Sequence, residues 1–141
     1  MFDGLLKALD FGPTCYCEVF QQSMKNQSFG KRLGFAVKGL LCAWRGEASF
    51  RQQVVIALGV VLVLLWRQPA PLWWALLLMN CGLVLAVELI NTALEHALDH
   101  LHPARHPAIE LAKDCAAGAV LILVITGLGV FTLFVLSELR R

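Results

Sequence analysis

Charged side chains are scarce in this chain: Asp, Glu, Lys and Arg make up only 16% of its 141 residues, whereas 58% are hydrophobic. An average soluble domain carries about 25% charged residues, so this composition favours an integral membrane protein of one domain over a soluble one. The formal net charge is only +2, and no arginine-rich patch is present. The sequence therefore predicts no nucleic-acid partner, whose recognition needs a basic surface.

Several familiar motifs are also missing. The chain has no Gly-x-x-x-x-Gly-Lys-Ser/Thr segment, which excludes a P-loop nucleotide site, and no Ser–His–Asp or Cys–His arrangement typical of nucleophilic catalysis. Cys15 and Cys17 have no second cysteine pair at zinc spacing, which disfavours a metal site or a disulfide there. The first 25 residues lack a continuous apolar core after a basic start, so we expect no cleavable signal peptide.

The chain does contain three long apolar stretches. Residues 54–66 are continuously apolar and can extend back to 48, residues 72–87 begin a helix that runs on to about 101, and residues 115–136 hold no charge. Each approaches the roughly 20 residues with which a helix crosses a bilayer. The connector 102–109 contains two prolines and is expected to be a loop. The predicted fold is all-α, an integral membrane protein with three transmembrane helices.

An amphipathic helix is expected before the first span. Its apolar residues recur at helical spacing (Phe29, Leu33, Ala36, Leu40 and Trp44), and its basic residues occupy another face (Lys31, Lys38 and Arg45). This pattern is typical of a surface helix at headgroup level, serving either as a mere anchor or as part of a site. Seven Lys or Arg residues precede the first span, one lies in the first connector and two lie in the second. This asymmetry predicts a cytoplasmic N-terminus and a cytoplasmic second connector.

One polar stripe interrupts the second span. Glu88, Asn91, Glu95 and Asp99 fall within an arc of about 80°, over a length of roughly 16 Å. Ionisable residues within a membrane helix indicate a functional site by default, although a single buried acid often only joins helices. Three spans are too few to enclose this stripe, so we expect it to face other helices in a symmetric oligomer.

The available side chains suit phosphate chemistry. Carboxylates are hard oxygen ligands that favour Mg²⁺ bound together with substrate phosphates, and a neighbouring lysine can neutralise phosphate charge; these residues are Glu47, Glu88, Glu95, Asp99, Asp114 and Lys113. A spare buried glutamate can accept a proton from a hydroxyl, and Asn91 could orient Glu88 or Glu95. His96 and His100 have zinc-compatible spacing, but we favour structural or phosphate-side roles for them.

These residues resemble the prokaryotic diacylglycerol kinase family. Residues 88–99 match its signature Glu-x-x-Asn-[Ser/Thr]-Ala-x-Glu-x-x-x-Asp, and the resemblance extends to 44–52 and 112–114 within residues 28–136. It implies a small homotrimeric membrane enzyme that phosphorylates a lipid hydroxyl from MgATP, at sites built from neighbouring subunits. Residues 1–27 would form an N-terminal extension, and residues 28–141 the kinase domain.

The resemblance also implies roles for individual residues. Glu88 would be the general base, Asn91 would support it, and Glu47 and Glu95 would ligate Mg²⁺. The residues expected to contact ATP are Phe35, Glu47, Glu95, His106, Lys113 and Asp114. The residues expected to contact the lipid are Arg32, Leu33, Phe35, Ala36, Val37, Leu41, Trp44 and Glu88.

The acceptor is expected to be a membrane lipid alcohol. Residues 91–96, 106–107 and 112–120 resemble the undecaprenol-kinase branch more than the diacylglycerol branch, so undecaprenol is narrowly favoured. Such an enzyme would lie in the bacterial inner membrane, with its active site cytoplasmic, and would serve phospholipid or cell-wall lipid-carrier recycling. Two alternatives use the same fold: a non-catalytic membrane assembly subunit, and a proton or ion pathway along the acidic stripe.

Overall fold

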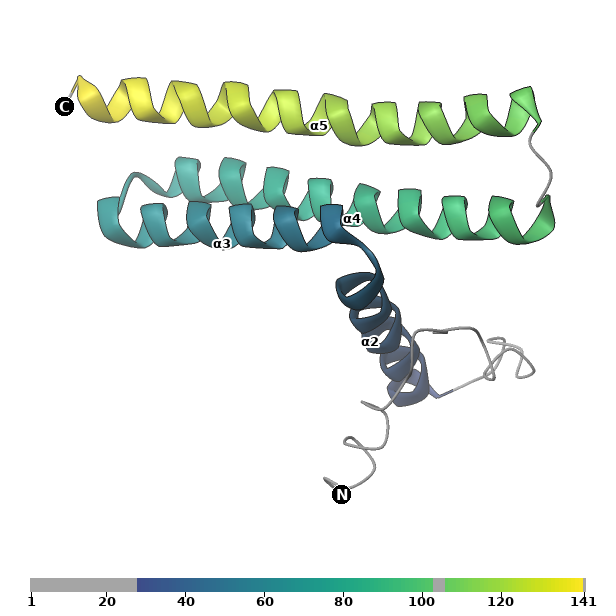
Figure 1. Cartoon of the computed structure of the whole chain (residues 1–141). Coiled ribbons are helices and arrows are strands. Elements are labelled where there is room, and N and C mark those ends of the chain that lie inside the picture. Colours follow the sequence, from purple (N-terminus) through teal and green to yellow (C-terminus); the bar gives the residue numbers. More distant parts are fainter. Residues whose placement is uncertain (1–27, 103–105, 141) are drawn as a thin grey trace. The chain divides into compact units, whose positions relative to one another are not determined.

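The computed structural model describes residues 28–102 and 106–140, and this part of the chain is entirely helical outside its connectors. Its helices are α2 (Phe29–Gly46), α3 (Ala48–Arg67), α4 (Pro71–Leu101) and α5 (Pro107–Leu139) (Figure 1). The all-α prediction is confirmed. The expected N-terminal extension, with Cys15 and Cys17, lies outside the described residues.

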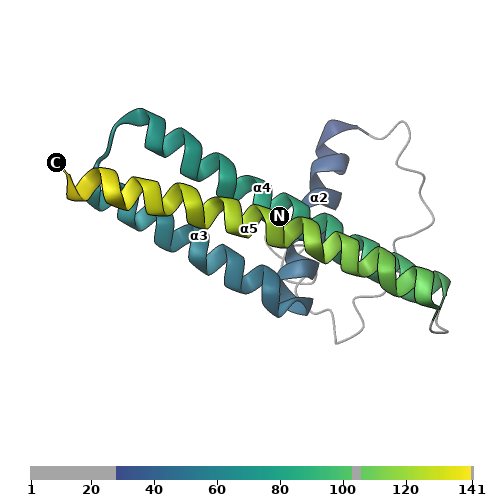
Figure 2. The ribbon, with the colours of Figure 1, turned by 90° about the horizontal axis from the view of Figure 1, so that it is seen from above.

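The three predicted spans are confirmed as α3, α4 and α5. Within residues 28–102 and 106–140, these are the three helices that are long and apolar enough to cross a membrane. Consecutive helices run antiparallel, and α4 packs against both of its neighbours. Seen from above, the C-terminal half of α5 lies over α3 and α4, in projection between them (Figure 2). Buried side chains of all three helices pack together there. The apolar helix surfaces that remain exposed suit contact with lipid or with other helices.

The best-packed part of the bundle lies where α3 ends and α4 begins. Leu64, Leu77 and Phe134, one from each helix, form the buried core there. The rings of Trp73 and Phe134 meet edge to face, with centroids 5.7 Å apart. At the same end, the Arg67 guanidinium lies 3.3 Å from the Glu138 carboxylate, which links α3 to α5.

Two prolines set where the later helices start. Gln68 ends α3 in a left-handed conformation, with φ of 45°, and its N–H donates to the Leu64 carbonyl. Pro71 then opens α4 as its first residue. Pro107 opens α5 in the same way, so the expectation of a loop as far as residue 109 is wrong. Proline fits the first helical position because its missing N–H has no intrahelical partner there.

The lengths of the helices place the polar stripe. The 20 residues of α3 extend about 30 Å, which matches the hydrocarbon thickness of a bilayer. The 31 residues of α4 extend about 46 Å, so roughly 16 Å of this helix exceeds that thickness. Because α3 ends where α4 begins, the excess lies beyond the start of α3, at the C-terminal end of α4. We infer that Glu88 lies near the membrane boundary, and that Glu95 and Asp99 lie outside the hydrocarbon.

Helix α2 has the amphipathic character that the sequence predicts. It begins after Ser28, whose carbonyl accepts hydrogen bonds from the N–H groups of Lys31 and Arg32. It exposes large apolar side chains at helical spacing, among them Phe29, Leu33, Val37 and Leu40. An exposed apolar stripe with basic residues on another face is the pattern of an interfacial membrane helix.

Candidate active site

The most buried acidic group among the described residues is Glu88, whose exposed fraction is only 4%. Both of its carboxylate oxygens accept hydrogen bonds from side chains of α3. The Ser49 hydroxyl donates to Oε1, and the Gln53 amide nitrogen donates to Oε2 at 3.0 Å. An ionised carboxylate is acceptor-only, so these two donors match the charged form of Glu88. This arrangement holds the Glu88 carboxyl group between α3 and α4.

Asn91 is expected to support Glu88, but its side chain bonds Glu95 instead. Its amide nitrogen donates to Glu95 Oε1 at 2.8 Å, four residues further along α4. Its carbonyl oxygen Oδ1 is buried and has no hydrogen-bond partner among the described residues. The donors to Glu88 thus come from α3, whereas Asn91 holds the Glu95 carboxylate. A buried acceptor without a partner also marks a place where a ligand could bind.

Glu47 contacts α4 at His96. It caps the start of α3, and its Oε1 lies 3.4 Å from Nε2 of His96, the residue that follows Glu95. The two carboxylates with a predicted metal role therefore come from different helices to one end of the bundle. His96 pairs with this carboxylate, and within residues 28–102 and 106–140 no three His, Cys, Asp or Glu side chains gather as a metal site.

The far end of the stripe meets the start of α5. The Lys113 ammonium forms an ion pair with the Asp99 carboxylate, which joins α5 to α4. Lys113 therefore lies at this end of the stripe, while the neighbouring Asp114 is exposed. His106 caps α5, and its Nδ1 accepts a hydrogen bond from the Ala108 N–H at 3.2 Å. The stripe thus passes from the buried Glu88 carboxylate to a more exposed ion pair between Asp99 and Lys113.

The residues expected to contact the lipid lie mostly on α2. They are exposed with one exception, the half-buried Phe35, and comprise Arg32, Leu33, Phe35, Ala36, Val37, Leu41 and Trp44. Large apolar side chains among them keep about half of their surface accessible, for example Leu33 at 56%. The surface is therefore open to an apolar ligand or to lipid.

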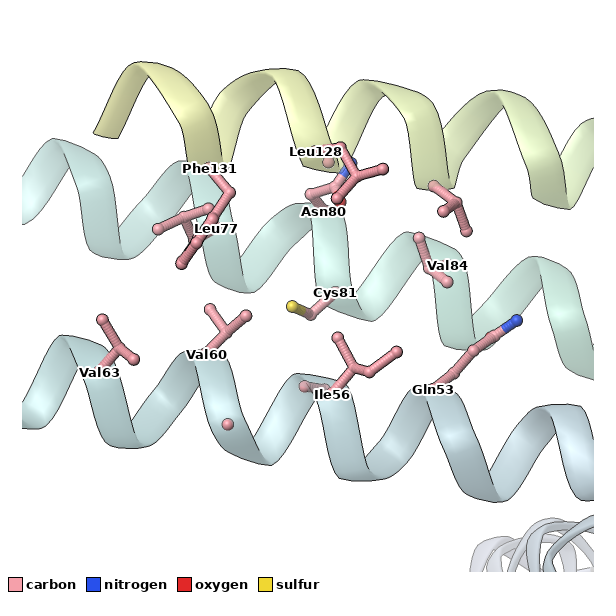
Figure 3. Close-up of a pocket in the computed structure, with 14 residues that line it drawn as sticks. Gln53, Ile56, Val60, Val63, Leu77, Asn80, Cys81, Val84, Leu128 and Phe131 are labelled. Carbon is pink, nitrogen blue, oxygen red and sulfur yellow. The ribbon is translucent and has the colours of Figure 1, made fainter. Parts of the chain in front are cut away.

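An apolar cavity of about 460 Å³ lies between α3, α4 and α5 (Figure 3). Aliphatic and aromatic side chains such as Val60, Leu77 and Phe131 form most of its wall. Gln53, which bonds Glu88, lies at one end of it, and Asn80 adds a second polar group. Because this wall is apolar, it strengthens the hydrogen bond from Gln53 to Glu88.

Ser49 and Gln53 are the site residues that sequence reasoning missed. They are four residues apart, so they share one face of α3 and point to the same neighbouring helix. Both are polar residues in the first turns of a helix that becomes apolar after them. Two polar residues on one face at the start of an apolar helix indicate a polar partner on a neighbouring helix. The sequence does not show that this partner is Glu88.

Comparison with known proteins agrees with this arrangement. The family model described as prokaryotic diacylglycerol kinase matches residues 34–135. The chain belongs to this family. The match includes Glu47, the whole stripe from Glu88 to Asp99, and Lys113 of α5.

Named relatives match about two thirds of this chain. The diacylglycerol kinase of Helicobacter pylori strain J99 is 39% identical over 92 residues, which are 65% of this chain and 72% of the relative. The diacylglycerol kinase of Escherichia coli K12 is 37% identical over 95 residues, which are 67% and 78% of the two chains. The undecaprenol kinase of Bacillus subtilis 168 is 31% identical over 94 residues, which are 67% and 76%.

Membership of this family makes the protein an ATP-dependent membrane lipid kinase. The absence of a P-loop is consistent with that activity, because phosphoryl transfer needs positioning and charge stabilisation rather than one particular motif. In the described chain, Asn91 bonds Glu95 on α4, and Lys113 of α5 pairs with Asp99.

Proposed function

We propose that this protein transfers the γ-phosphoryl group of ATP to the hydroxyl of a membrane lipid alcohol, with Glu88 as the general base. The observation that carries this proposal is the position of Glu88. It is a buried carboxylate near the inferred membrane boundary, and both of its oxygens are held by donors that match its charged form. A lipid hydroxyl lies at the same depth, because it is the polar end of a membrane-embedded molecule.

Glu88 accepts the proton of the lipid hydroxyl while the hydroxyl oxygen attacks the γ-phosphorus. The bond between that phosphorus and the β–γ bridging oxygen breaks, and ADP leaves with the bonding electrons. Lys113, at the exposed end of the stripe, stabilises phosphate charge. The 12 residues from Glu88 to Asp99 then run from the lipid hydroxyl toward the nucleotide.

The residues present fit Mg²⁺ as the companion of ATP. Mg²⁺ prefers oxygen ligands and commonly uses one or two carboxylates together with substrate phosphates, so it needs no cage of protein side chains. Asn91 holds the Glu95 carboxylate, and its own buried carbonyl oxygen has no partner in the described chain. Glu95 and Glu47 would hold the ion, which supplies neutralisation of phosphate charge.

The proposed setting is the bacterial inner membrane, with the site on the cytoplasmic side. Six Lys or Arg residues precede α3 and Arg51 lies in its first turns, which supports a cytoplasmic start of α3. ATP is then available on the side to which α4 projects. We also propose a homotrimer with shared sites, supported by the many apolar side chains that α3, α4 and α5 leave exposed.

Two acceptors are candidates, each with its own support. The relatives named diacylglycerol kinase share 37–40% of aligned residues with this chain, more than the 31% of the Bacillus subtilis undecaprenol kinase. The residues around the second connector instead favour undecaprenol, as the sequence analysis predicts. The two lipids differ in chain chemistry, whereas each presents a hydroxyl to the same base.

A transfer assay tests the activity and identifies the acceptor. Purified protein in mixed micelles receives γ-labelled ATP and Mg²⁺ with diacylglycerol, with undecaprenol or with neither lipid. We expect labelled lipid phosphate only when an alcohol is present, and a higher kcat/KM for the true acceptor. Absence of labelled lipid with both alcohols would favour a non-catalytic assembly subunit. Proton or ion flux through reconstituted vesicles without added ATP would favour the pathway alternative.

A further inference from the structure

We infer that Ser49 and Gln53 are positioning residues, which hold the Glu88 carboxylate in the orientation that accepts the proton. This inference rests on the proposed function, because it assigns these residues an effect only through Glu88. The two residues and Glu88 form one hydrogen-bonded unit that joins α3 to α4.

The geometry restricts Glu88 from two directions. The Ser49 hydroxyl donates to one carboxylate oxygen, and the Gln53 amide donates to the other at 3.0 Å. One donor alone leaves a carboxylate able to swing about the remaining bond, whereas donors on both oxygens fix the plane of the group. General-base catalysis depends on such alignment, because the base must meet the proton within hydrogen-bond reach.

The surroundings of Gln53 indicate more than a chance surface contact. Its carbonyl oxygen Oε1 is buried and has no hydrogen-bond partner among the described residues, although its amide nitrogen bonds Glu88. Gln53 also borders the apolar cavity between the three spans (Figure 3). An unpaired buried carbonyl oxygen costs free energy, and the hydrogen bond from the amide nitrogen to Glu88 offsets part of that cost.

The experiment measures kcat and KM for both substrates in three variants. Ser49→Ala removes the hydroxyl, Gln53→Met removes the amide at similar length, and Ser49→Thr keeps a hydroxyl. We expect each of the first two variants to lower kcat about tenfold, with the KM for ATP unchanged, and Ser49→Thr to stay within about twofold of wild type. Ser137→Ala is the matched control, because that serine bonds only its own helix, at the Phe134 carbonyl.

The decisive comparison adds Glu88→Gln. Without the base, removing Ser49 should change the residual rate less than about twofold, because a positioning residue acts only through the group it holds. A tenfold loss in that background would overturn the inference and indicate a structural role. Full kcat in both Ser49→Ala and Gln53→Met, with Glu88→Gln inactive, would also overturn it. Near-normal activity of Glu88→Gln would instead contradict the proposed base, so the two failures are distinguishable.

Discussion

The close packing of α4 against α5 at Gly127 gives a prediction about stability. A Cβ added at Gly127 would overlap the Asn80 side chain, whose amide nitrogen donates to the Leu123 carbonyl at 3.4 Å. A Cβ added at Gly129, two residues further along the same helix, would meet nothing within 4 Å. Gly127→Ala and Gly129→Ala therefore make the same chemical change in two different surroundings.

The expected free energies follow from these contacts. Replacing glycine by alanine within a helix favours folding by up to about 1 kcal/mol, and this gain applies to both positions. At Gly127, Asn80 must rotate away, which costs a hydrogen bond worth about 0.5–1.5 kcal/mol together with some loss of packing. We expect Gly127→Ala to be about 1–2 kcal/mol less stable than Gly129→Ala.

The measurement is the free energy of unfolding in mixed micelles, for both variants in the wild-type background and in the Asn80→Ala background. Removing the Asn80 amide opens the space, so the difference between the two alanine variants should disappear there. Equal stabilities of Gly127→Ala and Gly129→Ala in the wild-type background would refute the close contact of Gly127 with Asn80. The result bears on the site, because the same pairing of α4 with α5 brings Lys113 to Asp99.

Three further predictions concern the site. Glu47→Ala and Glu95→Ala should each weaken the use of MgATP, and the double variant should be little worse than either in steady-state assays, as for residues that act as a unit; multiplying losses would indicate separate sites. Asn91→Leu should raise the KM for MgATP more than it lowers kcat, because Asn91 holds Glu95; a loss confined to kcat would assign Asn91 to the base. Co-expressed Glu88→Gln and Lys113→Ala chains should recover partial transfer activity if subunits share a site, and no recovery in verified mixed oligomers would mean that both residues act from one chain.

Much of the fold follows from elementary patterns in the sequence. Hydropathy and length predict the three spans, because a helix in lipid must be apolar over a fixed distance. The prediction that the second connector reaches residue 109 is wrong. It takes proline as a residue that ends a helix, whereas Pro107 is the first residue of α5. Proline disrupts the interior of a helix but fits its first turn, so its effect depends on its position in the helix.

The site was harder to predict than the fold. Helical spacing places Glu88, Asn91 and Glu95 on one face, but it cannot choose which neighbour Asn91 bonds, since Glu88 and Glu95 both lie within one turn. The donors to Glu88 come from α3, at separations of 39 and 35 residues along the chain. Contacts over such separations depend on how two helices are aligned, which their individual periodicities do not encode.

The central claim is that Glu88 removes the proton from the lipid hydroxyl. Its most direct test is the initial rate of label transfer from γ-labelled ATP to the lipid acceptor by purified Glu88→Gln protein, measured beside wild type. This substitution keeps the size of the side chain but removes its ability to take the proton. We predict a transfer rate roughly 10²–10⁴-fold lower than that of wild type, with the KM for ATP and the free energy of unfolding unchanged. A rate close to that of wild type would contradict it.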